Sequence, residues 1–518
     1  MNTQHDKLKQ EIEEFRKLGH QFLNKEISVG DFKGKSGGMG VYAQRGGASF
    51  MIRLRTNSGL LPLNHLRLIN SFIDSYKIKN IHLTTRQAIQ LHNLGIDEVC
   101  DIMSTALDNG LYTRGGGGNF PRNVALSPMS GVEKGEAFDG TEVANAISKY
   151  LIEQITEYKL PRKLKISIST SSDDSANSTI NDIGFLGKIK NEKPCFDLYL
   201  AGGLGNNPEV SIKYPEDVEP DEVLYYIEAM VKLFMAEGDY KNKAKARTRY
   251  IAKRMGTDEF ISCYKKHLEE VKAAKNLTLN LKLKPSTTLK TYTHMFNETS
   301  YLIPQRQDGL YTVIIHPLCG ILDSGDFKEI LNFLEKNHTC EARLSMNENI
   351  YIRNLNTDHA LSLLEITSKF RAHNKIKKSV SCIGVPTCQI GIEESQTLIK
   401  NILTHLEKND ITQEYLPSIN VSGCQNSCAR HQVAVLGFVG GKRKIGDSLE
   451  SVFTLYYGGT VKEGETKLGN KISSMIARDI PIFIGELASK LSEKRQHFSE
   501  FCAIEHDQFI NLVKKYSL

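Results

Sequence analysis

The chain repeats itself, and this duplication limits its possible folds more than any other feature of the sequence. Similar landmarks recur in the same order at offsets of about 253 to 261 residues. The matched pairs are Gly59 with Gly320, Asn93-Leu94 with Asn354-Leu355, Leu160-Pro161 with Leu416-Pro417, GFLG at Gly184 with GFVG at Gly437, and DLYLAGG ending at Gly203 with FTLYYGG ending at Gly459. An internal duplication of this kind predicts two related units that pack about a pseudo-two-fold axis.

Each half opens with the same predicted run of secondary structure. Alternating apolar residues indicate strands, and apolar residues at helical spacing indicate helices. In the first half the ranges are 50–56, 63–76, 80–85, 88–94 and 97–110; in the second they are 310–317, 326–337, 341–346, 350–355 and 357–373. Both runs read βαββα, and each is small for an independent core. We therefore expect the two copies to pack together as one pseudo-symmetric α+β module.

A larger unit follows each run. Residues 163–170 and 419–423 indicate strands, and 135–158 and 393–408 indicate helices. A length of 518 residues predicts about three or four domains. The predicted division is an N-terminal helix and arm (1–44), a first half-domain (45–112), a larger domain (113–280), a linker (281–305), a second half-domain (306–373) and a second larger domain (374–518).

Four cysteines form two tight pairs near the C-terminus, Cys382 with Cys388 in SCIGVPTC and Cys424 with Cys428 in SGCQNSC. Four thiolates suit an iron-sulfur cluster. A structural zinc ion also takes four cysteines, but its paired ligands usually lie two to four residues apart. Here five residues separate the first pair and three the second. The spacing favours a cluster over zinc, and unpaired core cysteines are the third alternative.

The remaining six cysteines are scattered singly, at Cys100, Cys195, Cys263, Cys319, Cys340 and Cys502. They do not form a disulfide framework, and the charged N-terminal segment lacks the apolar core of an export signal. We expect a cytoplasmic protein. No stretch reaches the roughly 18 apolar residues of a membrane span. A net charge of +6 without a basic stripe does not indicate a nucleic-acid partner.

Basic residues concentrate in the half that lacks the cysteine pairs. Arg53 and Arg55 alternate in one predicted strand, and Lys163 and Lys165 alternate in another. Arg86, Arg122 and Arg162 lie nearby in sequence. At the positions of the cysteine loops the first half carries PRNVALSP and LPRKLK, and we expect Ile419 and Val421 to stand where the two lysines are. Adjacent cations repel unless an anion lies between them, so the pattern predicts an anion site.

In these residues the chain resembles the siroheme-dependent sulfite and nitrite reductases. The resemblance covers nearly all of the chain from about Gly34. The motifs appear in the family's order: GVYAQR at Gly40, MIRLR at Met51, TTRQAIQLH at Thr84, PRNV at Pro121, LPRKLK at Leu160, AGGLG at Ala201, AKARTRY at Ala244, the cysteine pair at Cys382 and GCQNSC at Gly423. It implies an α+β, internally duplicated fold with two ferredoxin-like half-domains in one module and two larger α+β domains.

The resemblance also implies the cofactors and their contacts. A [4Fe-4S] cluster is expected on Cys382, Cys388, Cys424 and Cys428, with Cys428 also bridging to the siroheme iron. The expected tetrapyrrole contacts are Arg55, Arg86, Gln90, His92, Arg247 and Asn426. The expected substrate pocket is formed by Arg53, Arg122, Lys163 and Lys165. Siroheme is rich in carboxylates, which accounts for a pocket lined with Arg and Lys.

The expected reaction is the six-electron reduction of sulfite to sulfide. Nitrite reduction to ammonia is the alternative, and Lys165 favours sulfite because nitrite reductases usually have Asn at that place. The oxygenating enzyme of cobalamin synthesis shares the scaffold, but the full set of pocket cations argues against it. A non-redox, zinc-stabilised anion-binding protein is the remaining alternative.

Electrons are expected to come from a separate protein. GMGVYA from Gly38 and GGLGNN from Gly202 lack the context of a dinucleotide fingerprint, and no flavin domain is evident. Ferredoxin is the expected donor to a monomeric reductase, with a flavoprotein subunit as the alternative. The chain departs from the family pattern at Gln425 and at Ala429-Arg430, where Pro and Gly are common. We expect Arg430 to provide another carboxylate partner beside the cluster.

Overall fold

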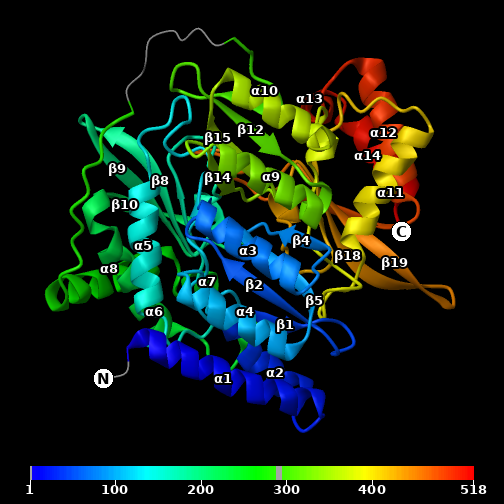
Figure 1. Cartoon of the computed structure of the whole chain (residues 1–518). Helices are drawn as coiled ribbons and strands as arrows, with labels where there is room; N and C mark the ends of the chain where they lie inside the picture. Colours follow the sequence, from blue (N-terminus) through cyan, green and yellow to red (C-terminus); the bar gives the residue numbers. More distant parts are fainter. Residues whose placement is uncertain (1–2, 287–294) are drawn as a thin grey trace.

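The computed structural model of the protein describes residues 3–286 and 295–518. Residues 1–2 of the predicted N-terminal arm and residues 287–294 of the predicted linker lie outside the described residues. Within the described part, the strands form four five-stranded sheets, in two related pairs. The first pair builds the half-domain module, and the second pair builds the two larger units (Figure 1).

The two half-domain sheets are antiparallel and have matching strand orders. The first has the order β1-β2-β5-β4-β13, with β1 Val41–Ala43, β2 Phe50–Arg55, β5 Ala88–Leu94, β4 Asn80–Leu83 and β13 Ile321–Asp323. The second has the order β11-β12-β15-β14-β3, with β11 Leu302–Pro304, β12 Tyr311–Ile315, β15 Ile350–Leu355, β14 Glu341–Leu344 and β3 Leu60–Leu61. The predicted βαββα run is present in both copies.

Each half-domain lends one strand to the other. β3 of the first half pairs with β14, and β13 of the second half pairs with β4. Gly59 and Gly320 precede these strands with φ of 85° and 69°, a left-handed conformation that favours glycine. The repeated glycines therefore mark the turns that send the chain into the neighbouring sheet. The sequence predicted neither exchanged strand.

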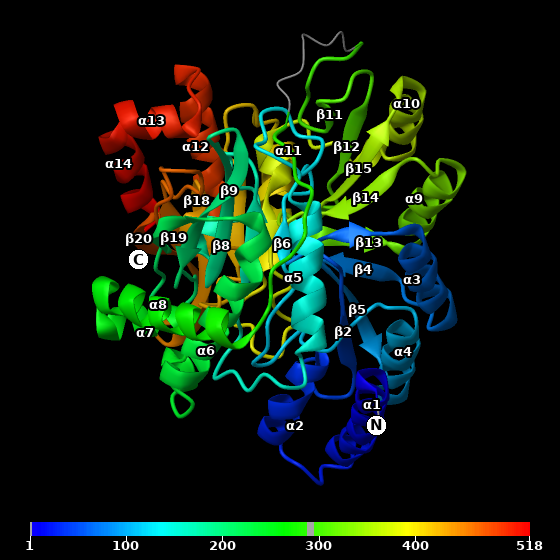
Figure 2. The same cartoon turned by 90° about the vertical axis from the view of Figure 1, so that its left-hand side faces the viewer.

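One hydrophobic core joins the two half-domains. Helices α3 (Leu63–Ser75) and α4 (Ile96–Asp108) cover the first sheet, and α9 (Ser324–Lys336) and α10 (Thr357–Ile366) cover the second (Figure 1). α3 and α9 lie side by side in both views (Figure 2). A single cluster of buried residues includes Ile69 and Ile330 from these two helices, and α1 (Gln4–Leu23) packs on it through Leu8 and Phe15. The expected pseudo-symmetric α+β module is confirmed.

The two larger sheets are also copies of one another. Their orders are β6-β7-β8-β9-β10, with β6 Ala125–Leu126, β7 Ile166–Ser169, β8 Ile183–Lys190, β9 Lys193–Leu200 and β10 Ile212–Val218, and β16-β17-β18-β19-β20, with β16 Val380–Ser381, β17 Ile419–Ser422, β18 Leu436–Ile445, β19 Ser448–Tyr457 and β20 Asn470–Ile476. In each, the first three strands are parallel and the last two are antiparallel.

Helices pack beside these larger sheets (Figure 2). They are α5 Thr141–Glu153, α6 Val223–Glu237, α7 Thr248–Met255 and α8 Thr257–Ala274 in the first unit, and α11 Ser395–Lys408, α12 Ile480–Lys494, α13 Phe498–Ile504 and α14 His506–Tyr516 in the second. The remaining helix, α2, spans Val29–Ser36. The helix predicted over 135–158 is shorter, because a turn at Gly135 (φ 79°) precedes it. The division into domains at the expected boundaries stays a prediction.

The strand registers of the two larger sheets correct the expectation that Ile419 and Val421 replace the lysines. Ile166 pairs with Ile183 in the first copy, and Ile419 pairs with Leu436 in the second. Ile419 is therefore the counterpart of Ile166 and not of Lys163. The lysines come before β7, whereas the cysteines follow β16 and β17, so the two sets do not occupy equivalent positions. In the described part of the chain, no helix has the length and apolar character needed to cross a membrane.

Candidate active site

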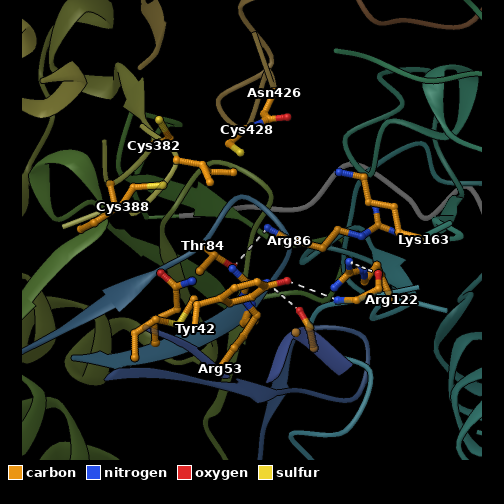
Figure 3. A pocket seen from close by; sticks show the side chains of 18 of the residues that line it. Tyr42, Arg53, Thr84, Arg86, Arg122, Lys163, Cys382, Cys388, Asn426 and Cys428 are labelled. Atoms are coloured by element: carbon orange, nitrogen blue, oxygen red, sulfur yellow. Dashed lines mark hydrogen bonds between the residues drawn. The ribbon is translucent and has the colours of Figure 1, made fainter. Parts of the chain in front are cut away.

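A cavity of about 1040 Å³ lies between the half-domain module and the two larger units. Its described lining comes from both copies of the duplicated chain, and it includes eleven Lys and Arg side chains but only three Glu. The four predicted cluster cysteines line one side. Figure 3 shows Cys382, Cys388 and Cys428 on that side, Arg122 and Lys163 on the other, and Arg86 between them. The cavity is thus a cationic chamber that ends at a group of sulfurs.

Two loops bring the sulfurs together. Cys382 and Cys388 follow β16, and Cys424 and Cys428 follow the adjacent parallel strand β17. The Gly423 N–H donates to Cys382 Sγ at 3.2 Å, and Asn426 Nδ2 donates to Cys424 Sγ at 3.4 Å. Hydrogen bonds of this kind favour the thiolate form of a sulfur ligand.

Burial opposes ionisation of these thiols in the protein alone. It raises the pKa of Cys382 to about 12, and the neighbouring Cys428 adds to this shift. Burial also raises the pKa of Cys388 and Cys424. A bound metal group is needed to hold such sulfurs as thiolates. A zinc ion requires its ligands to converge on one point, and no three His, Cys, Asp or Glu side chains of the described residues do so.

The opposite side of the cavity holds the four residues predicted for the substrate pocket. Arg53 extends from β2, Arg122 precedes β6, and Lys163 and Lys165 precede β7, with all four in the cavity wall. Leu164, between the lysines, is fully buried in the core, so the two ammonium groups share one face. The main chain of Lys165 is fixed by a 2.8 Å hydrogen bond from its N–H to Asp182 Oδ2.

Burial and neighbouring cations lower the pKa of three of these side chains. Burial lowers the pKa of Lys163 to about 7, with added repulsion from Arg247 and Arg122. Burial and the neighbouring Lys163 lower the pKa of Lys165 well below its ordinary value. Burial also lowers the pKa of Arg122 to about 10. An anion in the cavity offsets the repulsion among these cations, so the site suits negative charge.

The middle of the cavity contains polar atoms with no protein partner. Arg86 donates from Nη2 to the Ile166 carbonyl at 2.5 Å, but its Nε and Nη1 are buried without a partner. Both ring nitrogens of His92 are also buried and unpaired, and burial lowers its pKa to about 3. The Gln90 amide lies between His82 and Arg53, and its oxygen accepts a hydrogen bond from Arg53 Nη2 at 2.6 Å. Asn426 completes this predicted set in the wall.

Two predicted tetrapyrrole contacts lie behind the wall instead. Arg55 is 6% exposed and donates from Nη1 to the Arg114 carbonyl at 2.8 Å. Arg247 is held by Asp182 through two hydrogen bonds of 2.9 and 2.6 Å. Neither side chain is among those that line the cavity. Their charges act on the site from behind the residues that line it, because neither side chain reaches the cavity.

Arg430 lines the cavity, and its expected role as a carboxylate partner stays a prediction. Its guanidinium donates to the Met346 carbonyl and to Asn347 Oδ1, each at 2.6 Å, so these donors link the second cysteine loop to the second half-domain. Its φ of 58° lies in the left-handed region, which explains why glycine suits this position. Beside it lies buried Glu348, whose pKa burial raises to about 8. Glu348 is the repeat counterpart of Gln87, and both have positive φ.

Sequence reasoning did not assign several lining residues. Tyr42 lies in the quoted GVYAQR motif, and Arg162 lies in LPRKLK, so both were visible as motif members. The four consecutive glycines at 115–118 are a further signal, because Gly116 and Gly118 form part of the wall. Asn123, which lies in the quoted PRNV motif, and Asn181 also line the cavity, and no pattern in the sequence points to Asn181.

The residues present fit a carboxylate-rich tetrapyrrole next to an iron-sulfur cluster. The unpaired Arg86 and Arg122 nitrogens need acceptors, and the excess of cations needs anions. The four sulfurs at the same cavity match the ligand set that a [4Fe-4S] cluster requires. Fold and site together define a redox protein that holds a polyanionic prosthetic group beside a metal cluster.

Comparisons with known proteins lead to the same class. The family model for the nitrite/sulfite reductase ferredoxin-like half domain matches twice, at residues 42–108 and 303–369. The model for the nitrite and sulphite reductase 4Fe-4S domain matches residues 117–272, in the copy without the cysteine pairs. The matched segments together span more than half of the chain.

Relatives of similar length carry two different names. A sulfite reductase [ferredoxin] of Mycolicibacterium paratuberculosis is 25% identical, over 92% of this chain and 88% of that protein. A ferredoxin–nitrite reductase of Synechococcus elongatus is 26% identical, over 85% of each chain. The solved structure of Mycobacterium tuberculosis NirA protein has the same fold, with a TM-score of 0.76, 22% identity, and coverage of 94% of this chain and 92% of that one.

The chain belongs to the nitrite and sulfite reductase family and is an oxidoreductase. Members of this family use a siroheme and a [4Fe-4S] cluster, which confirms the expected cofactors. The α+β duplicated fold is confirmed as well.

Proposed function

We propose that this protein reduces sulfite to sulfide with six electrons from a separate donor protein. The observation that carries the proposal is the placement of Lys163 and Lys165 side by side in a cavity that also holds Arg53 and Arg122. Sulfite, as a dianion, gains more from a fourth cation than nitrite does. Relatives named sulfite reductase [ferredoxin] support this choice.

The four cysteines would hold the cluster, and Cys428 is assigned as the thiolate on its siroheme side. Bound siroheme would supply the iron at which the oxyanion is reduced, with single electrons arriving through the cluster. Arg86, Gln90, His92 and Asn426 are the tetrapyrrole contacts that line the cavity. Arg55 and Arg247 support them from behind.

The substrate residues have two tasks. Arg53 and Arg122 bind the oxyanion and balance its charge. Lys163, whose pKa is lowered to about 7 by burial and by neighbouring cations, holds a proton that it can release near neutral pH. Each oxygen that leaves as water consumes protons, so a cation with a lowered pKa suits this step.

The electron donor is proposed to be a ferredoxin, as in the names of the relatives. Support comes from the loop at Cys388, where Ile390 and Ile392 are 48% and 43% exposed. Arg45 donates to the Gly391 carbonyl at 2.8 Å, and Lys442 pairs with Glu393 at 2.9 Å, so basic side chains border this apolar surface. A small acidic protein could dock there close to the cluster ligands.

Nitrite reduction is the second candidate, favoured by relatives named ferredoxin–nitrite reductase at 26% identity. Steady-state assays with a chemical reductant should compare both substrates in wild type and in Lys165→Asn. We expect wild type to prefer sulfite and the variant to lose about tenfold in sulfite kcat/KM while retaining nitrite reduction. A wild-type enzyme that reduces nitrite much faster than sulfite would overturn the preferred substrate.

A further inference from the structure

Tyr42 lies in the substrate side of the cavity with no role yet assigned. It belongs to β1, and its ring lies 6.0 Å from the Arg53 guanidinium carbon. Its Oη accepts a hydrogen bond from the Gly118 N–H at 3.2 Å, and the Arg122 guanidinium lies near enough to lower its pKa. In Figure 3 its hydroxyl points toward Arg122, across from the sulfur side of the cavity. The phenol is therefore held between two of the proposed substrate residues.

The backbone around this hydroxyl is shaped by glycines. A Cβ on Gly117 would lie 2.3 Å from Tyr42 Oη and 2.3 Å from the Gly37 carbonyl oxygen. A Cβ on Gly37 would lie 3.1 Å from the same hydroxyl. Two chain segments can approach the phenol this closely only because both lack side chains. The four-glycine run thus serves to seat the tyrosine hydroxyl.

The Tyr42 hydroxyl can still donate one hydrogen bond. A phenol has one O–H hydrogen, and the hydrogen bond that Tyr42 Oη makes to the Gly118 N–H uses it as an acceptor, not as a donor. Among the described residues no acceptor for that hydrogen is found, and the nearest charged groups are guanidinium groups. Burial opposes ionisation, but Arg122 and Arg53 outweigh it and leave the Tyr42 pKa lowered. A hydrogen that faces a cationic cavity without an acceptor is matched to an anionic ligand.

We propose that Tyr42 is a further catalytic residue, which donates its phenolic hydrogen bond and then its proton to an oxygen of the bound oxyanion. This role rests on the proposed function. As one oxygen leaves, its bond to sulfur or nitrogen breaks, two electrons arrive from the donor protein, and two protons convert it to water. Tyr42 supplies one proton, Lys163 or water supplies the other, and the guanidinium groups stabilise the phenolate until water reprotonates it.

The test uses the holoenzyme with Tyr42→Phe and with 3,5-difluorotyrosine incorporated at position 42. The fluorinated phenol still accepts from the Gly118 N–H but is ionised at the assay pH, so it keeps the structural contact and lacks the hydrogen. Tyr240→Phe is the matched control, because Tyr240 also hydrogen bonds through its hydroxyl but is 52% exposed and outside the cavity. Cofactor absorption and iron content report intact loading.

Two quantities are measured: the affinity of the oxidised enzyme for sulfite, from its absorption spectrum, and kcat with sulfite and nitrite. We expect both position-42 variants to bind sulfite about tenfold more weakly and to lose about 100-fold in kcat. Either Tyr42→Phe within twofold of wild type, or a difluorotyrosine enzyme that keeps wild-type values, overturns the proposal. If wild type reduces neither anion, the proposed function fails, while the sulfite titration still decides whether Tyr42 donates to the oxyanion.

Discussion

Replacing Asp182 by Asn should destabilise the protein more than any single change at an exposed ion pair. Asp182 is fully buried and accepts four hydrogen bonds. Two come from Arg247 (2.9 and 2.6 Å), one from Thr248 Oγ1 (2.6 Å) and one from the Lys165 N–H (2.8 Å). Asn keeps the shape but not the charge, and its amide NH2 faces donors. Arg247 is then left buried without a counter-charge.

The expected loss follows from that geometry. Breaking a buried ion pair by removing one partner costs about 3–5 kcal/mol of the free energy of unfolding. An exposed pair is worth about 1 kcal/mol or less. Lys253 and Glu209, which are 3.2 Å apart with exposed side chains, provide the control through Glu209→Gln. Guanidinium chloride denaturation of wild type and both variants at pH 7 measures the two losses.

The pH dependence supplies a second check. Burial raises the pKa of Asp182, but Arg247 outweighs it, so the folded pKa lies below the ordinary 3.8. A carboxyl with a lowered pKa stabilises the fold above its unfolded value, and this contribution is lost as pH falls through the folded pKa. The gap between wild type and Asp182→Asn should therefore be constant above about pH 5 and narrow below pH 3.8. A loss of less than 1 kcal/mol at pH 7, or a gap that widens in acid, would refute the reasoning.

Three further predictions concern the wall and the sulfurs. Glu348→Gln should be more stable than wild type at pH 8, by about 4 kcal/mol at most. The reason is that the raised pKa of the Glu348 carboxyl removes wild-type stability as the pH rises from 4.5 through about 8. Denaturation at pH 5 and pH 8 measures this loss, and equal pH dependence of the two proteins would contradict it. Gly117→Ala should cost about 1–3 kcal/mol of unfolding free energy because its Cβ meets backbone and hydroxyl at 2.3 Å, whereas Gly441→Ala, whose nearest neighbour is 4.0 Å away, should change it little. Cys424→Ser should lose most of its iron and acid-labile sulfide in elemental analysis while Cys263→Ser retains both, and a full complement of iron in the first variant would remove Cys424 from the cluster.

Much of the fold could be predicted because its signals are local. Alternating and helical apolar patterns located the βαββα runs, and the repeat predicted that two copies share one module. β3 and β13 escaped prediction because segments of two or three residues carry no periodicity. Their partners lie in the other half of the chain, so only long-range packing selects them.

The same distinction applies to the site. Sequence identified the chemistry of the residues, because cysteine pairs and paired cations carry their meaning in residue type and spacing. Of the two alternating arginines in β2, however, only Arg53 lines the cavity, while Arg55 is used by the Arg114 carbonyl. A strand pattern states which residues share a face, but the neighbours that occupy their donors come from elsewhere in the chain.

The sequence by itself determined the duplication, the four candidate sulfur ligands and the excess of positive charge. Only the tertiary structure decided that these belong to one chamber, since Thr85 of the first copy donates to the Cys428 carbonyl at 2.7 Å across most of the chain length. It also decided that cations and cysteines sit at opposite ends of equivalent strands, and that Tyr42 faces the substrate side. The physical reason is that residue type fixes the charge and donors of a side chain, whereas its surroundings fix which donors remain free.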